Sequence, residues 1–130
     1  MNNAMTYALR IEEMDLSPFT LNLGYSKDAF KVISEKCYED FGLTCRKVER
    51  NDSLKEGEWL VAFFGFWATK FDYEGRPEVW DYAFCRQEDD GTWMERASIG
   101  SKPASIDINE MITEFHRIGI APMFMAVQKA

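Results

Sequence analysis

Four residues of this chain carry side chains suited to nucleophilic chemistry: three cysteines and the only histidine. A cysteine attacks a substrate as its thiolate, which usually forms beside a histidine or at the N-terminus of a helix. The cysteines are Cys37, Cys45 and Cys85, and the histidine is His116. Because His116 is far from every cysteine along the chain, only the fold could bring it to Cys37 or Cys85. A thiol hydrolase that uses one of these pairs is a first hypothesis. Its alternative is that each cysteine is a packing residue.

Other kinds of chemistry lack their usual signals. The chain contains no CxxC, HxxxH or EF-hand spacing, and one histidine does not make a typical zinc site. A glycine-rich phosphate loop is also absent. The acidic pairs Glu12-Glu13, Asp89-Asp90 and Glu56/Glu58 are typical of turns and exposed faces. We therefore expect neither a metal ion nor a cofactor.

Length and composition indicate one globular domain that spans residues 1–130. The chain is 46% hydrophobic and 15% aromatic, which favours a packed core over disorder. Three cysteines at irregular spacing favour free thiols in a reducing compartment. The first residues do not resemble a signal peptide, and the most apolar segment, Trp59–Ala68, is too short to cross a membrane as a helix. We expect a soluble, cytoplasmic protein.

The charge of the chain limits its partners. The formal net charge is −7, and no run of Lys or Arg is longer than the pair Arg46-Lys47. A nucleic-acid-binding protein needs clustered cations to displace counterions from phosphate, so we expect no nucleic acid and no membrane as partner. An acidic surface suits a protein with a basic surface, or it serves only solubility. A homodimer is a further alternative.

Hydrophobic periodicity predicts two helices. The first has an apolar face that repeats every three or four residues, with Ser26 as N-cap, Asp28 in the first turn and a stop at Gly42. The second begins at a capping box formed by Asp107 and Glu110 and stops at Gly119. The apolar faces contain Phe30, Ile33, Cys37 and Phe41 in the first helix, and Ile108, Met111, Ile112 and Phe115 in the second.

The remaining segments predict an antiparallel sheet of four to six strands. Trp80, Tyr82 and Phe84 alternate with smaller residues, and an Asp-Gly turn connects them to a second alternating run, which is typical of a hairpin. Trp59–Thr69 is apolar at nearly every position and predicts a central strand, in which Gly65 indicates a bulge or a close contact. Further strands are expected at Leu43–Glu49, at Ile120–Lys129 on an edge because of Pro122, and at Tyr7–Ile11, where a frayed helix is the alternative. The predicted fold is α+β, with the two helices packed on the sheet.

Several motifs in the middle of the chain resemble an uncharacterised family of bacterial and phage-associated proteins. In that family a strand with a "KVAL"-like core precedes "DYHFYRQ" and "DGTWSHK". Here the corresponding segments read "EGEWLVAFF", "DYAFCRQEDDGTWMERAS" and "SID". The resemblance covers Ile33 to Asp107. Its most specific positions are Asp81-Tyr82, Phe84, Arg86-Gln87 and Asp90-Gly91-Thr92-Trp93.

This chain departs from the family pattern at both of its histidines. Ala83 stands where the pattern has the first histidine, and Trp93-Met94-Glu95-Arg96 stands in place of Trp-Ser-His-Lys. If the family were papain-like enzymes, this chain would have lost the histidines, which favours binding over catalysis. A papain-like thiol hydrolase that uses Cys37 or Cys85 with His116 is the alternative.

We therefore expect a small acidic binding protein that occludes a partner, as immunity proteins and phage inhibitors of host enzymes do. The predicted docking site is the hairpin turn together with the preceding loop. Acidic side chains would steer a basic partner, and an exposed aromatic ring would anchor it. The predicted contact residues are Tyr73, Glu74, Glu88, Asp89, Asp90 and Trp93. The alternative is a solvated turn that was selected only for its geometry.

Overall fold

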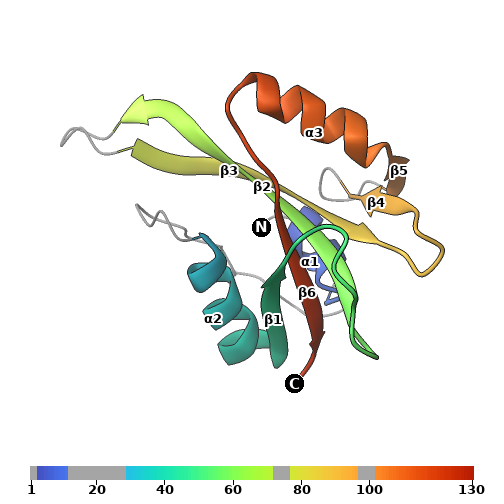
Figure 1. Ribbon diagram of the computed structural model, residues 1–130. Helices are drawn as coiled ribbons and strands as arrows, with labels where there is room; N and C mark the ends of the chain where they lie inside the picture. Colours follow the sequence, from blue (N-terminus) through green and yellow to red (C-terminus); the bar gives the residue numbers. More distant parts are fainter. Residues whose placement is uncertain (1–2, 12–28, 72–76, 97–101) are drawn as a thin grey trace.

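A computed structural model describes residues 3–11, 29–71, 77–96 and 102–130 of the chain (Figure 1). Its three helices are α1 (Asn3–Ala8), α2 (Ala29–Phe41) and α3 (Ile108–Arg117). Its six strands are β1 (Leu43–Val48), β2 (Trp59–Phe71), β3 (Pro77–Gln87), β4 (Trp93–Glu95), β5 (Ala104–Ile106) and β6 (Met123–Lys129). The predicted α+β fold is confirmed.

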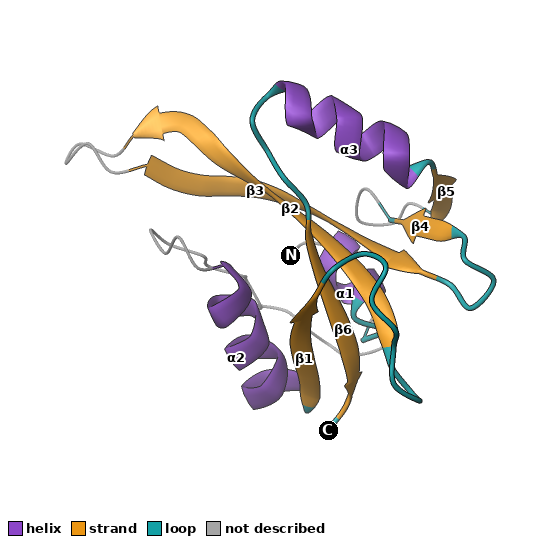
Figure 2. Cartoon of the chain, viewed as in Figure 1, coloured by secondary structure: helices purple, strands orange, loops and turns teal. Residues whose placement is uncertain are grey.

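The six strands form one antiparallel sheet, in the order β1-β6-β2-β3-β4-β5. The helices α1 and α2 pack on one face of this sheet and α3 packs on the other (Figure 2). Each face therefore has its own hydrophobic cluster, and the central strands contribute alternate residues to both.

Strand β2 is the central element of the sheet, as its apolar sequence predicted. All residues from Trp59 to Phe64 are at most 8% exposed. Trp59, Val61 and Phe63 face α1 and α2, whereas the intervening residues face α3. A Cβ atom at Gly65 would lie 3.1 Å from the ring of Phe63, so the close contact expected there is present. The pairing of β2 with β3 also has a register shift, which lies between Phe66 and Trp67 and not at Gly65 itself.

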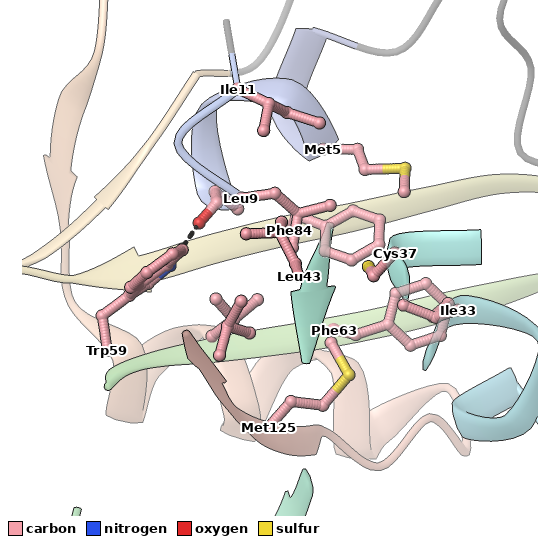
Figure 3. Close-up of a cluster of buried hydrophobic side chains, with 13 residues drawn as sticks. Met5, Leu9, Ile11, Ile33, Cys37, Leu43, Trp59, Phe63, Phe84 and Met125 are labelled. Carbon is pink, nitrogen blue, oxygen red and sulfur yellow. Dashed lines mark hydrogen bonds between the residues drawn. The ribbon is translucent and has the colours of Figure 1, made fainter. Parts of the chain in front are cut away.

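The cluster beneath α1 and α2 joins both ends of the chain to the central strands (Figure 3). Met5 and Leu9 enter it from the N-terminal segment, Ile33 and Cys37 from α2, and all four are fully buried. The indole Nε1 of Trp59 donates a hydrogen bond of 2.9 Å to the Ala8 carbonyl, which ties α1 to β2. Of the four residues predicted on the apolar face of α2, Ile33 and Cys37 are confirmed as core residues, and Phe30 and Phe41 are partly buried against the same cluster.

The strand predicted at Tyr7–Ile11 is wrong, because these residues finish a short helix and the turn after it. Their alternating pattern also fits helical spacing, since Met5, Ala8 and Leu9 fall on one face and are buried together. Packing against the sheet therefore selects the helix that was the alternative interpretation.

The C-terminal strand β6 is not on an edge of the sheet, which corrects the prediction made from Pro122. It lies between β1 and β2, pairing Ala126 with both Arg46 and Leu60. Pro122 precedes the first residue of the strand, Met123, so its missing N–H removes no bond from the ladder.

The predicted helix ends agree with the structure where it describes them. Helix α2 ends before Gly42, whose φ of 65° is favourable for glycine. Asp107 is the N-cap of α3, which ends at Arg117 just before Gly119. The N-cap predicted at Ser26 and the first-turn position of Asp28 lie outside the described residues. None of the helices that the structure describes is both long and apolar enough to cross a membrane.

Candidate functional site

The predicted acidic turn connects β3 to β4 and has a well-bonded backbone. The Glu88 N–H donates to the Thr92 carbonyl at 2.8 Å, and the Gly91 N–H donates to the Glu88 carbonyl at 2.9 Å. Gly91 has a φ of 89°, a conformation that glycine adopts without a steric penalty. The Asp90 carboxylate accepts a further bond of 2.9 Å from the Thr92 N–H. These bonds hold the turn in one conformation.

Two carboxylates of this turn are exposed to solvent. Asp89 and Asp90 are both on the outside of the hairpin. The bond from the Thr92 backbone N–H lowers the pKa of Asp90, because it stabilises the ionised carboxylate. At neutral pH the tip of the hairpin therefore presents fixed negative charge.

Glu88 has a different role from its two neighbours, because its carboxylate is bonded within the protein. It accepts a hydrogen bond of 2.7 Å from Arg86 Nε and one of 3.3 Å from the Tyr7 hydroxyl. Arg86 also donates to the Tyr7 carbonyl at 2.8 Å, and its guanidinium lies 4.0 Å from the centre of the Tyr7 ring. Glu88 thus fastens α1 to the hairpin and is not primarily a docking residue.

Trp93 does not provide the exposed aromatic anchor that the sequence analysis expected. It is 5% exposed and packs edge-on against Phe124, with ring centres 6.0 Å apart. The side chain lies on the sheet face that α3 covers, where it joins the second hydrophobic cluster. The prediction is wrong because strand alternation does not reveal which side chains of the hairpin the helices packed on the sheet will cover. Tyr73 and Glu74, the other proposed contact residues, lie outside the described residues.

Cys37 on α2 and Cys45 on β1 lie close together, and the interaction between their thiols shifts the pKa of both. This interaction and the burial of the side chain raise the pKa of Cys37, which is fully buried. The same interaction lowers the pKa of Cys45. Cys37 is therefore protonated at neutral pH and buried away from any substrate.

Cys85 lies on the opposite face of the sheet and is also fully buried. Its sulfur is 3.6 Å from the Met111 sulfur and 4.0 Å from a carboxylate oxygen of Glu95. Burial, followed by the negative charge of Glu95, raises the pKa of Cys85 to about 12. The same loss of solvent raises the pKa of Glu95. A thiol with this pKa is not a nucleophile at neutral pH.

His116 does not form a pair with either candidate cysteine in the part of the chain that the structure describes. It is exposed on α3, and the sheet separates this helix from the cluster that contains Cys37. Cys85 is on the same face as α3, but its neighbour there is Met111. Across residues 3–11, 29–71, 77–96 and 102–130, no cluster of three His, Cys, Asp or Glu side chains could hold a metal ion.

The structure also contains a cavity that sequence reasoning missed. It has a volume of about 780 Å³ and lies where the end of α1, the turn from α2 to β1 and the end of β6 meet. Arg10 and Trp59 belong to its lining, and their side chains contact each other. No local pattern predicted it, because its walls come from four segments that are distant in the sequence: residues 9–11, 41–43, 57–59 and 128–130.

Comparisons of this chain with protein-family models, curated proteins and solved structures found no match. The function must therefore be inferred from the geometry of these sites.

Proposed function

We propose that this chain is a small acidic binding module that covers a basic surface of a partner protein. The observation that carries the proposal is the hairpin turn, where Asp89 and Asp90 are exposed on a well-bonded backbone. A turn that is ordered before binding loses little conformational entropy when it docks. Fixed exposed charges also accelerate the encounter with a surface of opposite charge.

Two further observations support binding over catalysis. The net charge of −7 favours approach to a cationic surface at long range. The thiols of Cys37 and Cys85 have raised pKa values and are fully buried, so neither supports the hydrolase alternative. The proposed mode of action is occlusion, which is how immunity proteins and phage inhibitors of enzymes act, and it requires no reacting group.

The test compares two double variants that remove the same amount of charge from different places. Asp89→Asn/Asp90→Asn neutralises the turn, and Asn at position 90 retains an oxygen that can accept from the Thr92 N–H. Glu35→Gln/Glu39→Gln is the matched control, because both glutamates are exposed on α2. Each protein is immobilised at equal density and exposed to extract of the source cell, and the retained proteins are quantified by mass spectrometry.

We expect a basic protein that is retained by the wild type and by the α2 control but not by the turn variant. With that partner purified, the association rate constant of the turn variant should fall about tenfold at low salt and depend less on salt concentration. Equal retention and equal rate constants for all three proteins would reject the hairpin turn as the docking site. Equal losses in the two variants would show an effect of net charge alone.

A further inference from the structure

The cavity at the end of the sheet has the size and lining of a small-molecule site. Its volume of about 780 Å³ lies within the range of about 300–1,000 Å³ that is typical of ligand pockets. Most of its walls are apolar, with Leu9, Phe41 and Trp59 among them, and two cations, Arg10 and Lys129, also line it. An apolar body with an anionic group would complement both features.

Arg10 occupies an unusual backbone conformation at this site. Its φ is 57°, and it is the non-glycine residue with positive φ in the described part of the chain. The position follows the last turn of α1, where helices commonly place a glycine in this conformation. A side chain with a Cβ atom is strained there, and such strain often occurs where a residue is held for binding. Here the strained residue brings a cation to the edge of an apolar cavity.

The neighbouring contacts hold the Arg10 guanidinium over the cavity wall. Its Cζ atom lies 4.9 Å from the centre of the Trp59 ring. The Trp59 ring is itself fixed by its 2.9 Å hydrogen bond to the Ala8 carbonyl (Figure 3). The ion pair between Arg10 and Glu88 is 3.8 Å long, which is beyond hydrogen-bond distance. Arg10 therefore lines the cavity with an ion-pair partner that is not within hydrogen-bond distance.

We infer that this cavity binds an organic anion with a flat apolar body. A carboxylate or phosphate group of the ligand accepts hydrogen bonds from Arg10, and Lys129 adds a second positive charge to the lining. The apolar body packs against Leu9, Phe41 and the ring of Trp59. Two cations in one cavity stand out in a chain whose net charge is −7. The site adjoins the acidic turn through the ion pair of Arg10 with Glu88, but it does not depend on the function proposed for that turn.

The test uses naphthalene-2-carboxylate as the probe and naphthalene-2-methanol as a neutral probe of similar shape. Binding to the full chain is measured by isothermal titration calorimetry and by the NMR signal of the Trp59 indole N–H. We expect the carboxylate to bind saturably, at least about tenfold tighter than the alcohol, because only the carboxylate forms charge-assisted hydrogen bonds with Arg10. The absence of saturable binding, or equal affinity for the two probes, would overturn the inference.

Two variants distinguish binding by Arg10 from a general effect of removing one positive charge. Arg10→Asn removes the cation and places a residue that tolerates positive φ, so circular dichroism and the melting temperature should show an intact fold. Arg117→Asn is the matched control, because Arg117 is exposed on α3 at the opposite face. Arg10→Asn should weaken the carboxylate about tenfold and change the alcohol less than twofold, while the control changes neither. Equal effects of the two variants would overturn the inference.

Discussion

At the scale of single residues, Glu58 shows how the fold changes the proton affinity of a side chain. Arg46 donates to both of its carboxylate oxygens at 2.8 Å, and the Lys55 N–H donates to one of them at 2.6 Å. The side chain of Glu58 is 2% exposed. The bonds from Arg46, followed by that from Lys55, lower its pKa from 4.5 to about 2. This pair fastens the loop before β2 to strand β1.

Because the pKa of Glu58 is lower in the folded state, the pair stabilises the protein above pH 4.5 and loses this effect as the pH falls towards 2. We expect Glu58→Gln to lower the free energy of unfolding by about 1–2 kcal/mol at pH 7. Urea unfolding at several pH values should show the difference from wild type shrinking between pH 4.5 and 2. Glu56→Gln, at an exposed neighbour, is the control. A difference that is the same at pH 7 and pH 2 would contradict the assignment.

At the scale of elements, α3 has a polar cap that the sequence predicted. The Asp107 carboxylate accepts hydrogen bonds from the Asn109 and Glu110 N–H groups, at 3.0 and 3.2 Å. These N–H donors have no acceptor within the helix. The negative charge of Asp107 also interacts favourably with the helix dipole, whose positive end is at the N-terminus. The Asp107–Glu110 spacing identified this start because a cap depends on residues only a few positions apart.

Replacing the cap should destabilise the protein by a known increment. We expect Asp107→Ala to lower the free energy of unfolding by about 1 kcal/mol, because two backbone donors lose their acceptor. Asp107→Asn keeps an acceptor and should stay within a few tenths of a kcal/mol of wild type. Glu114→Gln, exposed further along α3, controls for the change of charge. The measurement is urea unfolding followed by circular dichroism, and equal losses in the two Asp107 variants would refute the capping role.

At the scale of the whole molecule, the sheet separates two hydrophobic clusters and places a cysteine in each. Cys37 belongs to the cluster under α1 and α2, and Cys85 to the cluster under α3. Both are fully buried, and burial contributes to the raised pKa of each thiol. A reagent can therefore reach either sulfur only when the corresponding helix detaches or the whole domain unfolds.

We expect iodoacetamide at pH 7 to modify Cys45 first, because this thiol is partly exposed and its interaction with Cys37 lowers its pKa. Cys37 and Cys85 should react at least about a hundredfold more slowly in the folded protein than in urea. Peptide mapping by mass spectrometry distinguishes the three sites. Rapid modification of Cys37 or Cys85 in the folded protein would support the alternative hypothesis of a thiol hydrolase.

The sequence by itself determined the features that depend on neighbouring residues. The apolar face of α2, the cap of α3 and the hairpin turn at Gly91 each follow from side chains within a few positions of one another. The run from Trp59 onward likewise identified the central strand, because an unbroken apolar stretch of this length needs cover on both faces. The acidic turn of Asp89 and Asp90 was predicted for the same local reason.

Only the tertiary structure decided how distant segments combine. In the tertiary structure Trp93 is buried in the core, and β6 lies between two other strands. Glu88 accepts a hydrogen bond from Tyr7, which is 81 residues away in the sequence. The tertiary structure also forms a cavity from Arg10, Trp59 and the ends of α2 and β6. The alternating pattern of a strand predicts that its side chains point to two opposite faces of the sheet. Which residues each side chain contacts depends on the helices that pack on those faces. Burial and contact between remote residues are properties of that packing, so no local pattern contains them.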